Sequence, residues 1–593
     1  MAGRLGERLG LARVGALRDR LFPEPPQSTR SPVPAFVLFA LVIVLYPAHQ
    51  LLTQGSMLLR GQMWAEMATN YYANAVSMPW YEQLFSTDAG YIPFPQRVAG
   101  LLGTVLDLPI TSIPYYYSAV AVLGAAVLAG AVCLPIFRTV LPNDYLRFAV
   151  AMATLLVADY QTRTYINFTY FVILLALFIA AWALLERRRE APLWMWVLPF
   201  LMLSKPAVLT VLPVIVLAAL VSRRRFRFIA AVTLLAGLVQ FVQLVISLSS
   251  SMIYQGSDAG ILSKVFWSLA YFVGWLGRLV VGSETEALDT VFAIAGVVVL
   301  LGLAALVAFA RSSASALVVA AVSSILFAML LNGVSFSSTF GGSLDLVAAD
   351  PERRLIGSAI GLFAIAAALL SALFEHPAVV RRRDALKGLP WLGGFATALA
   401  VGLFAIWFGA SGWLGSVAAA STPLSVGSAD VSQWQNQAGA LASDDEIVCI
   451  PIGPFGWLYG RDCRDLGPGP ASSNDVQFSG APAQAVEQTS YTLGVPEAVK
   501  EASVASIGIM VKPVSGSGTV SGRIELVTES GQVVRFDGLA EVQSGGGLVQ
   551  FGSTGSLPVD RVVGARALFD QPVEVGTISS AEGRVPAVLW LGR

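Results

Sequence analysis

The chain has 593 residues, of which 55% are hydrophobic and only 13% are charged. Because an ordinary soluble protein carries about 25% charged residues, this composition excludes a soluble enzyme and a disordered chain and predicts a polytopic membrane protein. Lys and Arg together number 38, as do Asp and Glu, so no basic excess points to nucleic acid as a partner. Three Cys and two His leave little material for a metal cluster, and we expect no metal site.

Three regions follow one another along the chain. Residues 1–30 are polar and rich in arginine and lack the short apolar core of a cleaved signal peptide, which predicts a cytoplasmic tail. Residues 31–412 consist mainly of apolar segments and form the predicted transmembrane domain. Residues 413–593 are rich in Gly, Ser and Val and contain alternating runs such as 504–512, which predict a β-rich soluble domain of the β-sandwich or jelly-roll type.

The fold class is therefore a polytopic α-helical membrane protein of about eleven spans followed by a β-domain. The expected spans are 33–53, 114–136, 146–158, 168–185, 192–204, 207–221, 228–249, 290–310, 313–333, 355–374 and 389–410. Segment 265–282 is also apolar, but we interpret it as an interfacial helix on the outer leaflet, with Trp275 and Arg278 among its surface anchors. Counting it as a span would move every later basic loop to the opposite side of the membrane.

The basic loops set the expected orientation. With the eleven spans above, they all fall on one side, which is then the cytoplasm; they contain Arg138, Arg147, Arg187–Arg189, Arg223–Arg227, Arg311 and Arg381–Lys387. The N-terminus is then cytoplasmic and the β-domain is extracytoplasmic. The abundant Ala, Val, Gly and Arg are typical of a GC-rich bacterium, so we expect a multi-pass protein of a bacterial plasma membrane.

Two cysteines of the β-domain lie close together in the sequence. Cys449 and Cys463 bracket a short loop in the compartment that we expect to be oxidising, which favours a disulfide between them. Closing such a loop would stabilise the fold by about 3 kcal/mol. The alternative is a pair of free buried thiols.

The first outer loop, residues 54–113, contains the clearest chemical signal. Glu66 lies on a predicted helix, and aromatic residues crowd the same loop, among them Trp64, Tyr71, Trp80 and Tyr91. A carboxylate beside aromatic rings suits a sugar acceptor, because the rings stack on the sugar and the acid takes a hydroxyl proton. The alternative is that the aromatic residues anchor the loop at the membrane surface and that Glu66 is solvated.

This loop resembles that of the GT-C glycosyltransferases, membrane enzymes that use polyprenyl-phosphate sugars. The resemblance rests on one span, an early acid on a helix (Glu66), the pair Trp80-Tyr81, and a turn that runs from Asp88 through Gly90-Tyr91 to Pro93. It covers the spans from about 33 to 410, mostly through topology. This sequence departs from the family pattern at the early acid, which is often Asp in the family but is Glu66 here. Asp88 is therefore a second candidate for the catalytic base. The C-terminal region is similar to the carbohydrate-binding domains attached to such enzymes.

The resemblance implies an inverting transfer of a sugar from a polyprenyl-phosphate donor to a cell-envelope glycan or glycolipid. Glu66 would deprotonate the acceptor hydroxyl, and Asp88 would position or bind the acceptor. Trp64, Tyr71, Trp80 and Tyr91 would contact the sugar or the acceptor. No cofactor is implied beyond the lipid-phosphate sugar as co-substrate, and a divalent cation is left open.

Cations near the outer leaflet would bind the phosphate of the donor. The sequence offers five at suitable places, namely Arg97, Arg163, Lys205, Arg353 and Arg354. Lys205 is the strongest of these candidates. Placing a lone lysine between long apolar segments costs free energy, and such a residue by default indicates a function. Its alternative is a loop residue that reaches the interface, and for Arg353 and Arg354 the alternative is an anchor at the end of a helix.

Two other classes of function compete with the enzyme. One is a transporter or flippase for a lipid-linked glycan, which the lack of an internal repeat and of paired broken helices in the sequence disfavours. The other is a non-catalytic envelope protein whose β-domain binds glycan. Neither the sugar nor the acceptor can be identified from the sequence.

Overall fold

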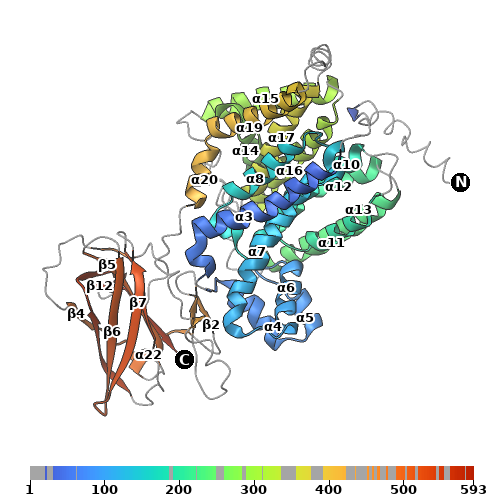
Figure 1. Ribbon diagram of the computed structural model, residues 1–593. Coiled ribbons are helices and arrows are strands. Elements are labelled where there is room, and N and C mark those ends of the chain that lie inside the picture. Colours follow the sequence, from blue (N-terminus) through green and yellow to red (C-terminus); the bar gives the residue numbers. More distant parts are fainter. Residues whose placement is uncertain are drawn as a thin grey trace. The chain divides into compact units, whose positions relative to one another are not determined.

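We describe the protein from a computed structural model (Figure 1). The described residues are 21–22, 31–59, 61, 63–185, 191–221, 224–248, 260–282, 289–309, 312–335, 355–375, 391–421, 434–435, 450–452, 457–459, 464–467, 476–478, 489–500, 504–514, 518–542, 546–552, 561–580 and 583–592. The chain divides into two compact units. The first, here the helical unit, contains Met1–Thr53, Leu84–Ala99 and Ala119–Thr422; the second, here the mixed unit, contains Gln54–Gln83, Gly100–Ser118 and Pro423–Arg593.

The helical unit is built around one completely buried helix, α10 (Val172–Leu185), which is apolar on all sides. Neighbouring helices cover it, and α16 and α17 pack against each other beside it. The further helices are α3 (Val33–Leu59), α7 (Ile113–Gly130), α8 (Asp144–Val157), α9 (Tyr160–Arg163), α11 (Val197–Met202), α12 (Leu212–Val221), α13 (Arg224–Leu248), α14 (Ile261–Val281), α15 (Asp289–Phe309), α16 (Ala314–Ser335), α17 (Ile356–Glu375), α19 (Trp391–Ala410) and α20 (Trp413–Ser421).

Eight helices within the described residues are long and apolar enough to cross a membrane, or nine if a bent pair is one span. They are Val33–Thr53, Ile110–Cys133, Phe168–Leu185, Arg225–Ser247, Ile261–Val281, Thr290–Phe309, Ala314–Gly333 and Ile356–Glu375. The chain is thus a multi-pass helical membrane protein. The number of eleven spans is not reproduced, since the expected spans 146–158, 192–204 and 207–221 contain only shorter helices.

The interfacial placement of 265–282 is not supported. Helix α14 is one of the eight candidate spans, and it packs along α15 and against α16. Trp275 and Arg278, which the sequence suggested as surface anchors, are buried, and the guanidinium of Arg278 lies between the rings of Trp275 and Trp413 at 4.6 and 4.4 Å from their centroids. Aromatic and basic residues mark an interface only when they face it, and here they face other helices.

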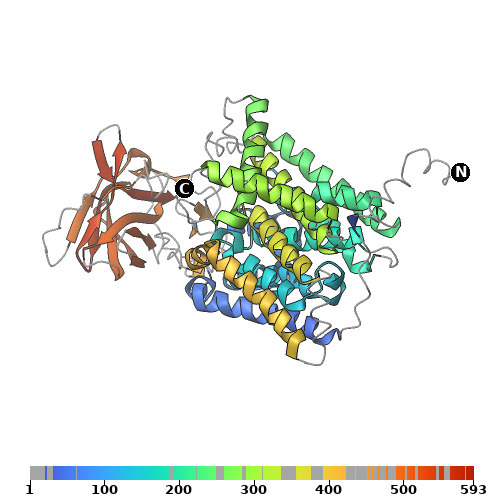
Figure 2. The same ribbon diagram turned by 90° about the horizontal axis from the view of Figure 1, so that it is seen from above.

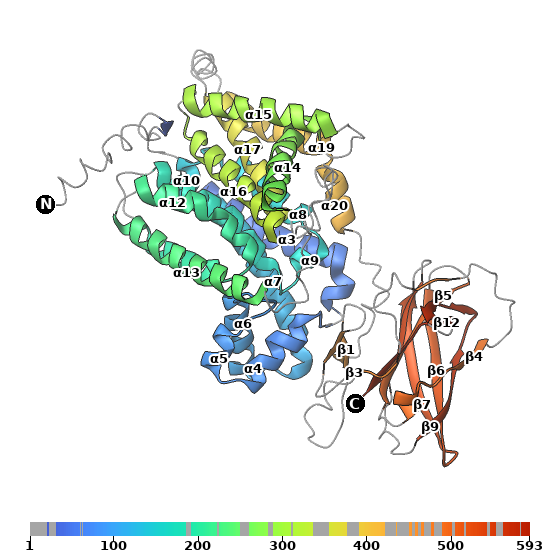
Figure 3. The same cartoon turned by 180° about the vertical axis from the view of Figure 1, so that it is seen from behind.

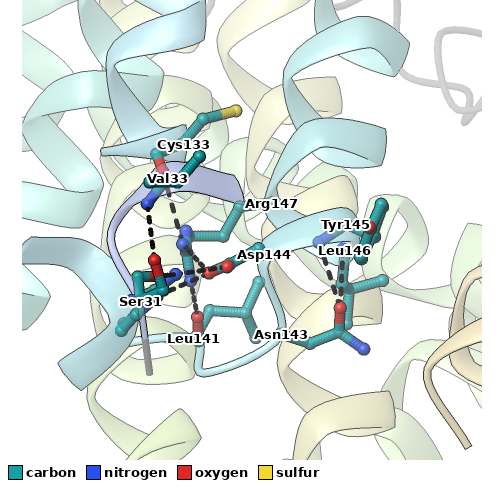
Figure 4. Close-up of polar contacts among 10 residues, drawn as sticks. Ser31, Val33, Cys133, Leu141, Asn143, Asp144, Tyr145, Leu146 and Arg147 are labelled. Carbon is teal, nitrogen blue, oxygen red and sulfur yellow. Dashed lines mark hydrogen bonds and ion pairs between the residues drawn. The ribbon is translucent and has the colours of Figure 1, made fainter. Parts of the chain in front are cut away.

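Two of the arginines that set the expected orientation, Arg138 and Arg147, are also buried. Figure 4 shows Arg147 beside Asp144 and the carbonyl groups of Leu141 and Cys133. Arg138 donates hydrogen bonds to both carboxylate oxygens of Asp144, from Nε at 2.8 Å and from Nη2 at 2.5 Å. Arg147 donates to Asp144 as well and to the carbonyl oxygens of Leu141 and Cys133. These arginines hold the start of α8, so they are weaker evidence for a cytoplasmic loop than exposed ones would be.

Two of the helical segments are broken. Leu193–Met202 and Pro206–Val221 are short apolar helices separated at residues 203–205, and both α11 and α12 pack against α13. Figure 3 shows α12 beside α13. Phe395–Ala410 and Trp413–Ser421 are bent by 75° at a second break. The bent pair at residues 411–412 was not predicted, because no long polar insertion marks the bend.

The C-terminal part of the mixed unit is a curled antiparallel sheet (Figure 2). The strands are β3 (Arg464–Asp465), β4 (Thr489–Leu493), β5 (Val504–Pro513), β6 (Gly518–Thr528), β7 (Val533–Val542), β8 (Gly547–Gly552), β9 (Val562–Phe569), β10 (Val573–Val575) and β13 (Val588–Gly592). Their order is β3-β13-β5-β8-β7-β6-β9-β4, with β10 beside β5. Alternate residues fill an apolar core on one face, as the alternating sequence predicts. Two separate hairpins, β1–β2 (Ile450–Ile452 and Trp457–Tyr459) and β11–β12 (Thr577–Ser580 and Gly583–Pro586), complete the described strands.

Candidate functional site

The part of the first loop that belongs to the helical unit contains a turn at residues 88–91. Two predicted site residues, Asp88 and Tyr91, lie in this turn. The backbones of Asp88 and Tyr91 pair through two hydrogen bonds, of 2.8 and 3.0 Å. Ala89 and Gly90 between them both have positive φ, 44° and 84°, as a two-residue hairpin turn with primed geometry requires. The turn thereby places the side chains of Asp88 and Tyr91 close together, and both are buried.

Lys205 completes a buried polar group with this turn. The Tyr91 hydroxyl donates to Oδ2 of Asp88 at 3.2 Å, and the Lys205 ammonium donates to the Tyr91 hydroxyl. Nζ of Lys205 also lies 4.4 Å from the centroid of the Tyr91 ring. Lys205 is only 6% exposed and Asp88 only 3%. An ammonium, a phenol and a carboxylate are thus linked in one hydrogen-bonded chain inside an apolar unit, where such interactions are stronger than in water.

The helix break at residues 203–205 brings Lys205 to this turn. Gln240 of α13 accepts from the Ile92 amide at 3.0 Å and donates to the carbonyl oxygen of Ser204 at 3.1 Å. The Phe94 amide donates to the carbonyl oxygen of Leu203 at 2.8 Å. Carbonyl groups that the break exposes are therefore satisfied by Phe94, in the segment that follows Tyr91, and by Gln240 of α13, which fixes Lys205 beside the turn.

Arg97 lies on the helix that begins directly after this turn, α6 (Phe94–Val105). It is fully buried, and its guanidinium donates to the carbonyl oxygen of Thr87 at 3.4 Å. The neighbouring Gln96 is buried as well and donates to the Ile166 carbonyl and the Thr169 hydroxyl, both at 3.0 Å. Three of the predicted residues, Asp88, Tyr91 and Lys205, thus form one group, and Arg97 lies on the same connected segment.

Gln240 and Gln96 were missed by the sequence analysis. Both are amides inside or beside long apolar runs, where a polar side chain without a partner is costly. That signal was available in the sequence, but the partners are backbone groups of distant segments, which the sequence does not identify.

Arg163 occupies a different environment from Lys205. It donates to the carbonyl oxygen of Ala420 at 3.1 Å and to that of Leu156 at 2.8 Å, and Gln50 lies within 3.5 Å. Burial lowers the pKa of its guanidinium, while the nearby Tyr46 and Asp159 act in the opposite direction. Carbonyl oxygens near the ends of α8 and α20 therefore hold this arginine, which suits a structural role and does not bring it into the Lys205 group.

Glu66 belongs to the mixed unit. It is half-buried and directly precedes a π-helix, Met67–Tyr72. The residue before it, Ala65, has a φ of 45°, which is unfavourable for any residue with a Cβ. Strained backbone and π-helical turns occur often at functional sites, so the local conformation of Glu66 is compatible with a catalytic role.

The aromatic residues predicted to contact the sugar do not share one environment. Tyr71 is fully buried and Trp64 is half-buried, whereas Trp80 is 63% exposed. Tyr72, which follows Tyr71, packs its ring at 5.8 Å from that of Trp434 and 5.9 Å from that of Tyr459.

This aromatic cluster is a packing feature of the mixed unit. Burial, and secondarily Tyr72, raises the pKa of Tyr459 to about 12. Trp434 is buried, as is Trp590 in the sheet, so neither is available for stacking on a sugar.

The remaining predicted residues lie outside the described part of the chain. These are Arg353 and Arg354, proposed for the donor phosphate, and Cys449 and Cys463, proposed to form a disulfide. The described residues contain no group of three His, Cys, Asp or Glu side chains that could hold a metal ion.

Comparison of the chain with protein-family models, with curated proteins and with solved structures finds no match. The resemblance to GT-C glycosyltransferases therefore stays a prediction from the sequence.

Proposed function

We propose that the chain is an inverting glycosyltransferase that moves a sugar from a polyprenyl-phosphate donor to a cell-envelope acceptor. The observation that carries the proposal is the buried ammonium of Lys205, linked through Tyr91 to Asp88 within an apolar helical unit. A buried lysine between apolar helices is expensive and is usually retained for function. A lipid phosphate is an anion that arrives within the membrane, which is where this ammonium would meet it.

In the proposed reaction the acceptor hydroxyl oxygen attacks the anomeric carbon of the sugar from the side opposite the phosphate. The bond between the anomeric carbon and the phosphate oxygen breaks, and its electron pair leaves with the phosphate. The acceptor proton passes to a carboxylate, which acts as general base. Lys205, together with Arg97 on the adjoining helix, would stabilise the negative charge that develops on the leaving phosphate.

Two carboxylates are candidates for the base. Glu66 is our choice from the sequence, and its position between the strained Ala65 and a π-helix supports a functional role. Asp88 accepts a hydrogen bond from Tyr91 and belongs to the Lys205 group. A carboxylate held in this way is suited to orient Tyr91 and Lys205, so we assign Asp88 the positioning role.

The proposal includes an orientation in a bacterial plasma membrane. The N-terminus would be cytoplasmic, and the loop with Glu66 and Asp88 would share the extracytoplasmic side with the β-domain. A polyprenyl-phosphate sugar and an envelope glycan are both available on that side. A reporter fused after residue 593 that reads cytoplasmic would contradict this orientation.

The direct test is a transfer assay in nanodiscs with radiolabelled polyprenyl-phosphate sugars and an envelope glycan fraction as acceptor. We expect label to move to the acceptor while polyprenyl phosphate is released in equal amount. The absence of transfer from every donor in a panel of pentose and hexose derivatives would contradict the proposal.

A transporter of lipid-linked glycan is a second candidate, because the helices are broken at 203–205 and at 411–412. Broken helices form substrate sites in many transporters, with helix N-termini directed at anionic groups. The same labelled lipids in proteoliposomes separate the two functions. Label that crosses the bilayer without being transferred would favour the transporter.

A further inference from the structure

The part of the first loop that contains Glu66 folds with the C-terminal part of the chain. Residues 54–83 and 100–118 both belong to the mixed unit, together with the β-sheet. Within this unit the π-helix that follows Glu66 contacts strand β2, which is far away in the sequence. Two neighbouring residues of the C-terminal part, Trp434 and Gln435, contribute most of the side-chain contacts that join the two segments, and we call them the loop clamp.

Gln435 holds both ends of the first outer loop with one amide group. Its Nε2 donates to the carbonyl oxygen of Gly61 at 3.0 Å and to that of Thr111 at 2.9 Å. Gly61 lies just after α3, and Thr111 lies just before α7. The amide therefore bridges the start and the end of the loop and fixes the distance between them.

The backbone at Gly61 is fitted to this amide. Its φ of 63° is a conformation that glycine adopts readily and other residues rarely adopt. A Cβ at this position would overlap Nε2 of Gln435 and would lie only 2.5 Å from the ring of Tyr115. Both the backbone conformation and the close approach of Gln435 thus require glycine here.

Trp434 connects the end of the loop to the π-helix. Its indole Nε1 donates to the carbonyl oxygen of Ile110 at 3.1 Å, and its buried ring lies 5.8 Å from the ring of Tyr72 in an edge-to-face arrangement. Tyr459 of β2 completes the contact, with ring centroids 5.9 Å from Tyr72 and 5.2 Å from Trp434. Because Tyr72 is the last residue of the π-helix that Glu66 directly precedes, these contacts act on the segment that carries Glu66.

The conformation around Glu66 needs such support. A π-helix is rare, and the positive φ of Ala65 adds backbone strain directly before Glu66. Strained conformations persist only where the surrounding structure fixes them. The loop clamp supplies this constraint, since it holds the two ends of the loop and the end of the π-helix at the same time.

We propose that Trp434 and Gln435 are positioning residues for Glu66, through which the C-terminal part of the chain fixes the loop that bears the catalytic base. The proposal rests on the proposed function, because it takes Glu66 as the base. It gives the C-terminal part a role in the transfer step that does not require glycan binding by the β-sheet. The two residues act through the loop and not on the reacting atoms.

Hydrogen exchange of the full chain in nanodiscs tests the loop clamp without requiring turnover. Gln435→Glu keeps the shape of the side chain, removes the amide donor and places a carboxylate against two carbonyl oxygens. Trp434→Phe keeps a ring and removes the indole donor. Gln571→Glu is the matched control, because Gln571 also donates to a backbone carbonyl, that of Thr519 at 3.1 Å, but in the sheet.

We expect the amides of residues 63–77 to exchange at least about tenfold faster in Gln435→Glu, and faster to a smaller extent in Trp434→Phe. Strands β6 and β7 should exchange as in the unaltered chain, and Gln571→Glu should leave residues 63–77 unchanged. Unchanged exchange of residues 63–77 in Gln435→Glu would overturn the proposal. Equally faster exchange in the loop and the sheet would overturn it too, because the substitution would then only lower the general stability of the unit.

Kinetics connects the loop clamp to the transfer step. Gln435→Glu should lower kcat by about ten- to a hundredfold with little change in KM for the donor, because Lys205 belongs to the helical unit. Gln571→Glu should keep both constants. An unchanged kcat in Gln435→Glu, despite faster exchange of the loop, would overturn the positioning role. If the unaltered chain transfers no sugar, the proposed function fails and the role toward a base fails with it, whereas the exchange data still show whether the clamp holds the loop.

Discussion

Lys205 is the residue on which the account of the site depends. Burying an ammonium costs several kcal/mol unless its partners compensate. Here the ammonium donates to the Tyr91 hydroxyl, which is itself bonded to Asp88, and it lies over the Tyr91 ring. Such an arrangement makes sense if an anion is bound during the working cycle. Removing the charge should therefore affect function far more than folding.

Lys205→Met keeps an unbranched side chain and removes the charge. We expect turnover to fall about a hundredfold or more, while thermal stability is unchanged or slightly higher because a buried charge is lost. Lys264→Met is the control, since Lys264 is half-buried in α14 and is not part of the Lys205 group. Equal activity of the two variants would show that Lys205 has only a structural role.

The identity of the base is tested by replacing each carboxylate with its amide. Glu66→Gln keeps the shape and should lower turnover by about a hundred- to ten-thousandfold while donor binding is largely retained. Asp88→Asn should mainly weaken donor binding, because Asp88 orients Tyr91 and Lys205. Single-turnover kinetics with separate donor titrations would distinguish these effects. If Asp88→Asn abolishes the chemical step and Glu66→Gln does not, the two roles are exchanged.

At the scale of elements, α14 and α15 are held together by glycines. A Cβ on Gly296 would overlap the carbonyl group of Val273, with only 2.6 Å to the carbonyl carbon, so the two helices approach each other through their backbones. Gly296→Ala should destabilise the protein by about 1–3 kcal/mol. Gly302→Ala on the same helix has no atom within 4 Å and should be neutral or stabilising by up to about 1 kcal/mol. Thermal unfolding in detergent measures both, and similar losses would contradict this packing.

The start of α8 depends on Asp144. Burial acts to raise the pKa of its carboxyl, but the hydrogen bonds and charges of Arg138 and Arg147 outweigh burial and hold that pKa below its ordinary value. The stabilisation is therefore present above the unfolded-state pKa, near 4, and is lost as the pH falls through the lower folded-state pKa.

Asp144→Asn leaves two buried arginines without a carboxylate and should cost about 3–5 kcal/mol. The loss should appear at neutral pH as a lower melting temperature and should shrink toward pH 3. A variant as stable as the unaltered chain at pH 7 would show that the ion pairs contribute nothing.

The elements show why some spans could be predicted and others could not. Long apolar runs such as 168–185 and 290–310 are long enough to be recognised as membrane spans from the sequence, and the structure has helices there. The runs at 192–204 and 207–221 are also apolar, and the sequence places their interruption near Lys205, but the helices there are too short to count as spans by themselves. The interfacial placement of segment 265–282 relied on its Trp and Arg residues as surface anchors, but burial depends on which helices pack beside them, and Trp275 and Arg278 are buried.

At the scale of the whole molecule, the division into apolar helices and a C-terminal β-domain was predictable from composition and from alternating patterns. The Lys205 group was predictable in part. Lys205 and Asp88 could each be selected from the sequence, but their connection through Tyr91 depends on the contact between the helix break at residues 203–205 and the turn at residues 88–91, which the sequence does not reveal. The cluster of Arg523, Arg535 and Arg566 around Glu525 on the sheet was not predicted, because these residues come together only through the strand register.

The most direct test of the central claim is a cryo-EM structure of the chain in nanodiscs with a non-cleavable polyprenyl-phosphonate sugar. The account predicts density for the phosphonate within hydrogen-bonding distance of the Lys205 ammonium, and loss of that density in Lys205→Met. A phosphonate bound elsewhere in the protein, away from the Lys205 ammonium, would contradict it.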